Sequence, residues 1–365
     1  MAFKPDSRGK LVDVRTPAVF SAHRPLTPYT KVSPLLVNLD ALLEGKKPRI
    51  CITRRQGGIG DVLMTLPTVR AVAQKYNTKV DYGTDFNYLD GALPKVLLDN
   101  PYIETVKSYN EVDPEDYHAV LDLTCPCVAH EQPRAIPINR IDLFARHLRI
   151  PLTDHSIDYH VRPEEEKWAQ EYLTHYNLDR FSLVMVNPSS STSTRDCPSD
   201  KLRQALSGLI STQRDIRLLV IVHDSDPRHG ENWNFAETHV LKNLDVRQLA
   251  VLLTRCKLLI CPDSAMLHVA SALHHPTLTI FGPTDPRARI NYHPEAVAIW
   301  PVKGLANYPC WYKDPCDGWI CWKRLDPNLI TLTAMAILSK QTLPNSEDLV
   351  TFGQYKMEEK HYQIV

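Results

Sequence analysis

Three glycines and an aspartate follow the first clear strand pattern of the chain, in the segment RRQGGIGDVLMTLPTVRAVAQKY at 54–76. Glycines after a strand let backbone N–H groups approach a ligand, and a helix N-terminus favours negative charge. The dinucleotide-binding pattern G-x-G-x-x-G would need a glycine at position 63, where Leu63 stands. The turn is therefore a poor match to a dinucleotide site.

Asp61 ends this glycine turn and starts the next helix pattern. A carboxylate at a helix N-terminus stays ionised, which suits a general base that must be deprotonated at neutral pH. The same charge would repel a pyrophosphate bound at the turn. The alternative is that Asp61 only caps the helix. Local rules leave both interpretations open.

A second polar group follows a buried strand pattern in LLICPDSAMLHVASALHHPTLTIFGPTDP, at 258–286. Asp263 ends the strand, Ser264 can cap the next helix, and His268 lies one turn further on. In open α/β sheets, ligands bind at the carboxyl ends of the strands, and free N–H groups at a helix start bind phosphate. His268 could reach a phosphate or sugar, or it could simply be a packed residue. The turn at 281–286 adds another loop at the same edge.

The elements that position these residues alternate between strand and helix patterns. In the first half we expect strands at 47–55, 78–82, 103–108 and 118–123, and helices at 62–73, 89–98 and 138–148. Pro67 lies inside the first helix pattern, so this helix is either kinked there or starts nearby. A helix at 163–176 connects the halves. In the second half we expect strands at 182–187, 216–223, 258–261 and 277–281, and helices at 199–211, 246–255 and 266–273.

This alternation implies parallel βαβ units and therefore an α/β fold with two doubly wound, Rossmann-like domains. We place the domains at 47–165 and 166–340, the second with a Cys/Trp-rich insert at 305–325. An irregular extension precedes them at 1–46, and a tail that is helical in part follows at 341–365.

The composition is that of an ordinary folded protein. The 365 residues are 43% hydrophobic and 23% charged, which is enough apolar material for two cores. The formal net charge is zero, so no global charge attracts nucleic acid or an anionic membrane. We expect no membrane span and no secretory signal. Nine cysteines scattered along the chain indicate reduced thiols and a cytoplasmic location.

Together the two polar segments resemble the lipopolysaccharide heptosyltransferase family, glycosyltransferase family nine. GGIGDVLMTLPTVRAV resembles its "GDxLLxxPxxRAL" opening, and CPDSAMLHVASALHHPTLTIFGPTDP resembles its "D(T/S)xxxHxAAALxxPxxxxFGPTDP" donor motif. The resemblance covers about residues 48–335. It implies a GT-B fold, with two Rossmann-like domains facing a central cleft. It also implies inverting, metal-independent transfer of a sugar from a nucleotide-diphosphate donor such as ADP-heptose, with no other cofactor.

The resemblance assigns roles to individual residues. Asp61 corresponds to the general base, and Asp263 and His268 to the donor-site acid and histidine. Arg195, in NPSSSTSTRDCP at 187–198, takes the place of the Lys or Arg that meets the donor phosphates, although Cys197 replaces the usual Trp. The predicted donor-binding set is Gly58, Gly60, Ser189, Arg195, Asp263, Ser264, Ala265, Met266 and His268.

Cys310, Cys316 and Cys321 stand in CWYKDPCDGWIC. Many members of the family carry a cysteine knuckle at this place, and some related protein heptosyltransferases bind iron there. Here Asn307 occupies the first cysteine position, and the spacing C-x5-C-x4-C is not a standard zinc pattern. We expect a structural remnant and no metal.

The acceptor is the least defined part of the prediction. Asp85 and the loop at 125–134 lie at strand ends, and Arg54, Arg55 and Arg70 supply basicity near the glycine turn. The tryptophans of the insert, Trp311, Trp319 and Trp322, could stack on an acceptor, but we favour packing.

The acceptor class therefore stays open among lipopolysaccharide core, a protein, and a hydroxylated base in phage DNA. Two other functions compete with a glycosyltransferase. A non-catalytic nucleotide-sugar binding protein would not need to keep Asp61, and an NAD-dependent oxidoreductase is weakened by Leu63.

Overall fold

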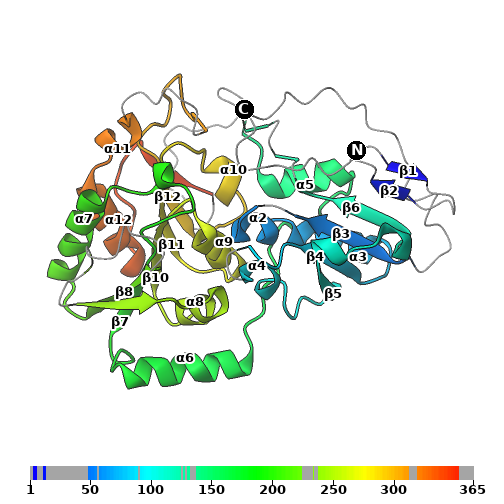
Figure 1. Cartoon of the computed structure of the whole chain (residues 1–365). Helices are drawn as coiled ribbons and strands as arrows, with labels where there is room; N and C mark the ends of the chain where they lie inside the picture. The colour runs from blue at the N-terminus through cyan, green and yellow to red at the C-terminus, as the bar shows by residue number, and fades with distance from the viewer. Residues whose placement is uncertain are drawn as a thin grey trace.

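Two parallel sheets, each flanked by helices, form two α/β units (Figure 1). The computed structural model describes residues 3–5, 11–13, 48–55, 57–88, 91–124, 126–127, 130–131, 137–223, 233, 237–311 and 319–352. Helix α6 (Pro163–His175) connects the units and runs along the outside of the second, at the bottom of Figure 1. The sequence-based prediction of two α/β sheets joined by a helix is confirmed.

The first unit has a six-stranded sheet in the order β1-β2-β6-β3-β4-β5. Its strands are β1 (Phe3–Pro5), β2 (Leu11–Asp13), β3 (Ile50–Arg54), β4 (Val80–Thr84), β5 (Ile103–Ser108) and β6 (Ala119–Asp122). Its helices are α2 (Ile59–Leu63), α3 (Leu66–Lys75), α4 (Ala92–Lys95) and α5 (Arg140–Leu148), with the 3-10 turns η1 (Tyr109–Glu111) and η2 (Pro114–Asp116). All pairings are parallel except that between β1 and β2.

The second unit has a seven-stranded sheet in the order β13-β12-β11-β10-β7-β8-β9. Its strands are β7 (Ser182–Val186), β8 (Ile216–Val222), β9 (Thr238–Lys242), β10 (Leu258–Pro262), β11 (Thr277–Ile280), β12 (Ala296–Ile299) and β13 (Leu349–Thr351). Its helices are η3 (Ser193–Arg195), α7 (Ser199–Thr212), α8 (Val246–Leu253), α9 (Ala265–Ala272), α10 (Arg287–Ile290), α11 (Ile320–Arg324) and α12 (Pro327–Leu338). Only β13 runs antiparallel to its neighbour.

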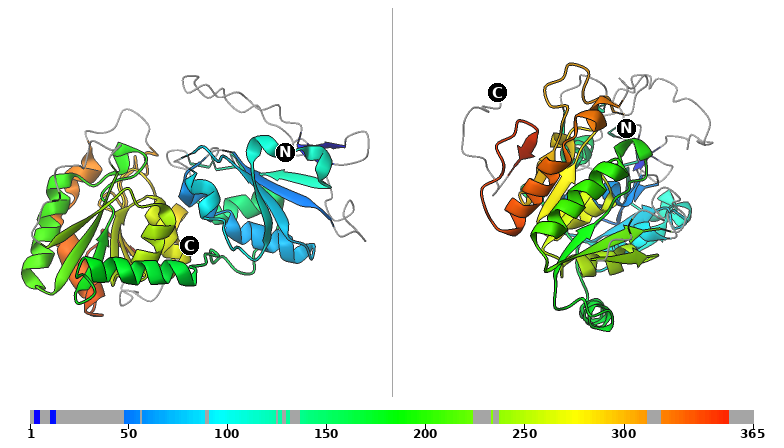
Figure 2. Two further views of the ribbon diagram at one scale, coloured as in Figure 1. Left: turned by 60° about the horizontal axis from the view of Figure 1, so that its bottom comes forward. Right: turned by 90° about the vertical axis from the view of Figure 1, so that its left-hand side faces the viewer.

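The central strands of the second sheet are buried on both faces because helices cover both faces. Helices α7 and α12 pack together on one side, and α8 and α9 lie on the other (Figures 1 and 2). Every residue of β10 and β11 is buried, including Thr277 and Thr279 of β11. Strands buried on both faces are typical of parallel sheets.

The helix predicted at 62–73 is two helices. Helix α2 ends at Leu63, and α3 starts at Leu66 with Pro67 in its first turn. Proline has no N–H to continue the hydrogen bonds of a preceding helix, and its fixed φ favours a helix start. As a result α2 is a separate short helix, and it packs against α9 of the second unit.

Helices α10, α11 and α12 were not predicted, and other differences lie at the edges of the sheets. The extension at 1–46, expected to be irregular, contributes β1 and β2, and β9, β12 and β13 were also not predicted. The tail forms a strand at β13 where we expected some helix, and residues 353–365 lie outside the described residues. In the part of the chain that the structure describes, every helix is too short or too polar to cross a membrane.

Candidate functional site

The predicted polar residues lie where the carboxyl ends of the two sheets approach each other. Contacts join the units directly: Arg289 of α10 donates to Glu131 at 2.9 Å, and the Tyr292 hydroxyl lies 3.0 and 2.9 Å from the two carboxylate oxygens of Asp142. We refer to the region between these contacts as the interface. It holds Asp61 on one side and Asp263 on the other.

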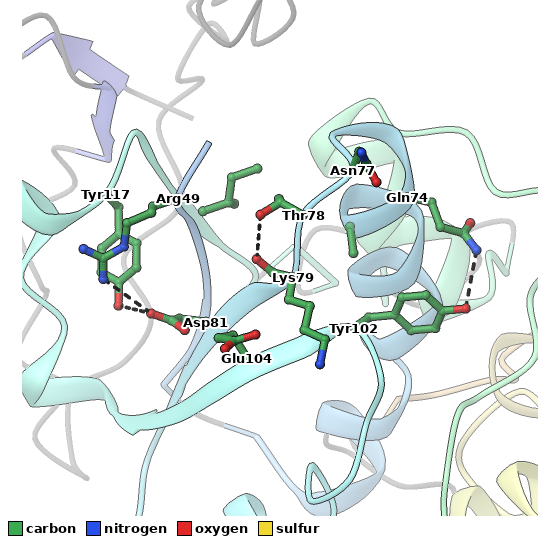
Figure 3. A pocket seen from close by; sticks show the side chains of 11 residues that line it. Arg49, Gln74, Asn77, Thr78, Lys79, Asp81, Tyr102, Glu104 and Tyr117 are labelled. Carbon is green, nitrogen blue, oxygen red and sulfur yellow. Dashed lines mark hydrogen bonds and ion pairs between the residues drawn. The ribbon is translucent and has the colours of Figure 1, made fainter. Parts of the chain in front are cut away.

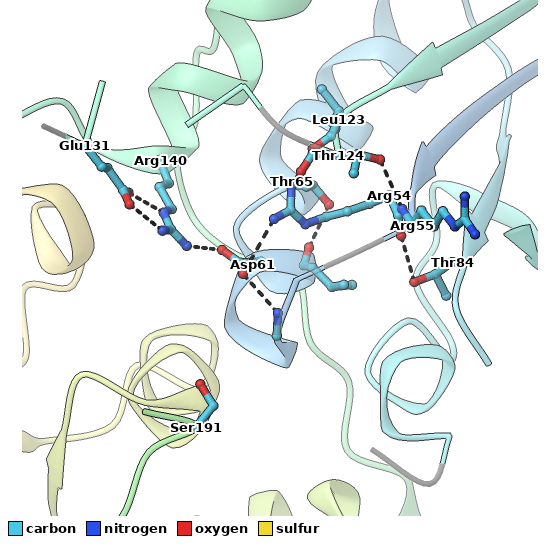
Figure 4. A network of polar contacts seen from close by, with 12 residues as sticks. Arg54, Arg55, Asp61, Thr65, Thr84, Leu123, Thr124, Glu131, Arg140 and Ser191 are labelled. Carbon is cyan, nitrogen blue, oxygen red and sulfur yellow. Dashed lines mark hydrogen bonds and ion pairs between the residues drawn. The ribbon is translucent and has the colours of Figure 1, made fainter. Parts of the chain in front are cut away.

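Asp61 is the third residue of α2, and three groups contact its carboxylate (Figure 4). The Gly58 N–H donates to Oδ2 at 3.0 Å, and Arg54 Nη2 lies 3.5 Å from the same oxygen. Arg140 Nη1 donates to the other oxygen, Oδ1. Helix capping, the alternative left open by the sequence, thus accounts for only one of the three contacts.

The charge state of Asp61 follows from these neighbours. Burial raises the pKa of Asp61, but Arg140 and Arg54 lower it by more, so the pKa lies well below its usual range. The Asp61 side chain nevertheless keeps 16% of its surface exposed. The carboxylate is therefore ionised at neutral pH and still accessible to a small reactant.

Asp263 follows β10 on the other side of the interface. Its Oδ2 accepts from Thr284 Oγ1 at 2.9 Å and lies 3.4 Å from Arg289 Nε and 3.6 Å from Arg195 Nη1. Burial raises the pKa of Asp263, but Arg289 and Arg195 lower it to about 2. With a side chain only 3% exposed, Asp263 is placed to hold two arginines.

The start of α9 lies directly after Asp263. Ser264 occupies the N-cap position, but its hydroxyl accepts from Asn187 Nδ2 at 3.0 Å and makes no capping bond to α9. The capping role expected for Ser264 is therefore wrong. The first N–H groups of the helix, near Ala265 and Met266, lack a side-chain cap, as suits an anion site. Ser189, half-buried, lies in the loop after β7.

His268 is buried where α2 and α9 meet. Burial lowers the pKa of His268 to about 4, with opposing effects from Asp263 and Arg289, so the ring is neutral at pH 7. Its ring lies against Gly60, because a Cβ built on Gly60 would be 2.2 Å from His268 Cδ2. Gly60 thus has a steric reason to be glycine, while its predicted contact with a donor stays a prediction.

Three charged residues that the sequence did not single out complete the interface. Arg140 donates from Nε and Nη2 to the two oxygens of Glu131 at 2.6 and 2.7 Å, and Glu131 also accepts from Arg289. Only weak signals pointed to them, since Glu131 lies in the loop at 125–134 and Arg289 follows the 281–286 turn. The charges alternate in sign from Asp61 through Arg140, Glu131 and Arg289 to Asp263.

Two of the residues considered for an acceptor have local roles. Arg70 does not face Asp61: it pairs with Asp158 at 2.6 Å and with Asp154 at 3.1 Å. Asp85 accepts from the Asn87 N–H at 2.9 Å within its own turn. Much of the loop at 125–134 lies outside the described residues.

The packing interpretation is confirmed for Trp311 and Trp322, which are buried, whereas Trp319 is 44% exposed. Trp322 donates from Nε1 to the Thr194 carbonyl at 3.1 Å, in the loop that carries Arg195. Its ring also lies against Gly282 of the 281–286 turn.

The cysteine cluster is only partly described, because Cys316 lies outside the described residues. Cys310 is partly exposed and Cys321 is buried. Among the described residues, no group of three or more potential ligands is placed to hold a metal ion. The low-probability metal site at these three cysteines therefore stays untested.

A cavity of about 640 Å³ lies at the opposite, amino-terminal edge of the first sheet (Figure 3). Its charged lining residues include Arg49, Lys79, Asp81 and Glu104. None of the predicted site residues lines this cavity. The candidate site is therefore the interface.

Comparison with known proteins identifies the family. The model of glycosyltransferase family 9 (heptosyltransferase) matches residues 126–314. Lipopolysaccharide heptosyltransferase 1 of Escherichia coli (strain K12) is 24% identical over 157 residues, which are 43% of this chain and 47% of that protein. The chain thus spans about half the length of the curated relatives it matches.

Solved structures agree in fold. The family 9 glycosyltransferase of Veillonella parvula DSM 2008 has a TM-score of 0.62 at 17% identity, with 80% of this chain and 98% of that chain covered. E. coli ADP-heptose lipopolysaccharide heptosyltransferase II has a TM-score of 0.56 at 13% identity, covering 80% and 99%. E. coli heptosyltransferase WaaC with ADP has a TM-score of 0.53 at 17% identity, covering 79% and 99%.

At these identities the structures establish the fold alone, and it is the GT-B fold expected from the sequence. Because the family model covers more than half of the 365 residues, the chain belongs to glycosyltransferase family 9.

Proposed function

We propose that this protein transfers a heptose or a related sugar from an ADP-heptose-type donor to an acceptor hydroxyl. Family membership supports glycosyl transfer. Similar structures are named as an ADP-heptose heptosyltransferase and as a heptosyltransferase with ADP. In this proposal the first unit binds the acceptor and the second unit binds the donor.

The observation that carries the proposal is the state of Asp61. It is an ionised carboxylate, 16% exposed, at the carboxyl edge of the first sheet. The second unit faces it with Arg195 and with the uncapped start of α9. A base on one side and an anion site on the other is the arrangement that transfer from a nucleotide diphosphate requires.

The proposed reaction is a single displacement. Asp61 takes the proton of the acceptor hydroxyl while the acceptor oxygen attacks the anomeric carbon. The bond from that carbon to the diphosphate oxygen breaks, and the electron pair leaves with the nucleoside diphosphate. Attack from the face opposite the leaving group inverts the anomeric configuration.

The leaving diphosphate gains negative charge as the bond breaks. We expect Arg195 and the first N–H groups of α9, which lack a side-chain cap, to stabilise this charge, and neutral His268 to contribute a hydrogen bond. Protein groups alone supply this positive potential, so the proposal requires no metal. In this proposal, closure of the two units around the bound donor excludes water that would otherwise hydrolyse it.

The test is release of nucleoside diphosphate from candidate donors. The purified protein is incubated with ADP-heptose, and separately with UDP- and GDP-sugars. Each donor is offered with lipopolysaccharide core, with a protein acceptor, or with DNA containing hydroxylated bases. We expect ADP release that depends on one acceptor, whose mass then increases by one sugar, and an inverted anomeric centre by NMR.

Absence of release with every donor and acceptor would contradict the enzymatic proposal. If calorimetry still detects donor binding in that case, the protein is a nucleotide-sugar binding protein. Release from a UDP-sugar and not from ADP-heptose would retain the reaction and reject the donor.

A further inference from the structure

The two oxygens of Asp61 have different partners. Oδ2 is held by neighbours from the same turn and strand, the Gly58 N–H and Arg54. Oδ1 is held by Arg140, from a helix far along the chain. A carboxylate oxygen can accept two hydrogen bonds, so an acceptor hydroxyl that approaches Oδ1 would share this oxygen with Arg140.

Arg140 is itself fixed by Glu131. The Nε and Nη2 atoms of Arg140 bind both oxygens of Glu131 at 2.6 and 2.7 Å, which leaves Nη1 for Asp61. A two-point contact of this kind sets the plane of the guanidinium. Glu131 Oε1 also accepts from Arg289 of the second unit at 2.9 Å. The placement of Arg140 thus depends on a carboxylate that contacts both units.

We infer that Arg140 is a positioning residue that sets the proton affinity of Asp61. We also infer that Glu131 neutralises part of the positive charge of Arg140 beside Asp61. The inference rests on the proposed role of Asp61 as a base. The low pKa of Asp61 agrees with it, since an adjacent guanidinium favours the ionised form. A strongly stabilised carboxylate is a weak base, so Glu131 would offset part of the Arg140 charge.

Few other groups near Asp61 change charge near neutral pH. The titratable groups from the surrounding elements are Arg54, Tyr82, Tyr88, Cys127, Glu131, Arg140, Asp263, His268 and Arg289. Burial lowers the pKa of His268 to about 4 and raises that of Cys127 to about 11. Burial also raises the pKa of Tyr88, and it raises that of Tyr82 to about 12. A titration that appears in a variant is assigned to Asp61 if it is lost when Asp61→Asn is added to that variant.

The test compares Arg140→Met with Glu131→Gln. Removing the Arg140 charge destabilises the Asp61 carboxylate, so the acid limb of the kcat/KM profile should move up by about 1 to 3 pH units. Removing the Glu131 charge leaves the positive charges of Arg140 and Arg289 without part of their neutralisation. The acid limb of the profile should then move to lower pH, or stay below the pH range of the assay, and kcat should be lower. Arg140→Lys, which keeps the charge, should restore most of the wild-type profile.

A second readout does not depend on turnover. NMR of the ¹³C-labelled aspartate carboxyls in the full-length protein, with the Asp61 signal assigned from Asp61→Asn, follows Asp61 directly. A higher Asp61 pKa in Arg140→Met, with no rise in Glu131→Gln, would support the inference even if no donor is turned over, in which case the proposed function alone would fall. A higher Asp61 pKa in both variants, or no rise in Arg140→Met, would overturn it.

Two variants serve as controls. Arg146→Met removes an exposed arginine from the same helix, α5. Glu165→Gln removes a carboxylate that pairs with Arg247, away from Asp61. A role of Arg140 and Glu131 limited to stability predicts lower activity at every pH and an unchanged Asp61 titration. Glu131→Gln preserves side-chain size, so it remains informative if Arg140→Met does not fold.

Discussion

Asp61 and Asp263 occupy similar places in the two units and differ in what they can reach. Each follows a buried strand near a helix start, and each lies beside two arginines: Arg54 and Arg140 for Asp61, Arg195 and Arg289 for Asp263. The Asp61 side chain is 16% exposed, whereas that of Asp263 is 3% exposed. The contacts on Asp61 are divided between its two oxygens, while those on Asp263 converge on one.

The comparison indicates that the solvent access of an aspartate at a strand end separates two roles: an exposed carboxylate can react with a substrate, whereas a buried one holds its neighbours in place. Asp263 would have to leave Thr284 and two arginines to meet a reactant. Asp61 needs only a changed contact at Oδ1. The same residue type, in matching places, is therefore expected to react differently to substitution.

The largest expected effect is that of Asp61→Asn on the chemical step. The amide cannot take a proton from the acceptor, so kcat should fall by about 100- to 10,000-fold, the usual contribution of a general base. Arg140 retains Glu131 as a partner, and Arg54 retains the Leu123 and Thr124 carbonyls, so we expect a smaller loss of stability than in Asp263→Asn and little change in donor affinity. Steady-state rates with calorimetric donor binding measure both quantities, and an unchanged kcat would remove Asp61 from the mechanism.

Asp263→Asn should act in the opposite way. It removes the charge between Arg195 and Arg289, and breaking a buried ion pair costs about 3 to 5 kcal/mol. We expect a lower free energy of unfolding in urea and weaker donor binding. A variant that keeps its stability and donor affinity but loses kcat would reverse the roles assigned to the two aspartates.

Gly60→Ala should weaken the contact between the units. The new Cβ would lie 2.2 Å from His268 Cδ2, and relieving such a clash costs about 1 to 3 kcal/mol. In an open helix position the same change would instead stabilise by about 1 kcal/mol. Thermal unfolding and donor titration measure the outcome.

Gly58→Ala is the matched control, because nothing lies within 4 Å of a Cβ at that position. Its effect should be about 0.5 to 1 kcal/mol, because glycine is preferred to alanine at an N-cap and no clash adds to this cost. Equal effects of the two substitutions would show that His268 does not restrict position 60.

The framework of this site was predictable because its signals are local. A glycine turn after a strand identifies Asp61, and the end of a buried strand identifies Asp263. Strand β5 was predicted with the bounds observed, because turn residues flank it: Asn100 and Pro101 before it, and Asn110 and Pro114 after it. Short edge strands such as β13 were missed because three residues carry too little pattern.

The charges between the two aspartates were not predictable in this way. Arg140 and Asp61 are 79 positions apart, and Arg289 and Glu131 are 158 apart. Such pairs depend on how the chain brings distant segments together, and no periodicity records that. At 62–73, Pro67 correctly indicated that a helix could start nearby, but the apolar spacing continues across the break and gave no sign that α2 is a separate helix.

The smallest expected effect concerns the donor side alone. Trp322→Phe removes the hydrogen bond from Nε1 to the Thr194 carbonyl and keeps most of the packing against Gly282. One such bond contributes about 0.5 to 1.5 kcal/mol, so donor affinity should fall by about 2- to 10-fold through a looser Arg195 loop. Trp319→Phe, at a 44% exposed position, should cause no measurable change in donor affinity.

Because Trp322 does not contact Asp61, kcat at saturating donor and its pH dependence should stay those of the wild type. A lower kcat in Trp322→Phe would mean that the donor loop also positions the reacting groups. Donor binding and proton transfer could then not be assigned to separate sides of the interface.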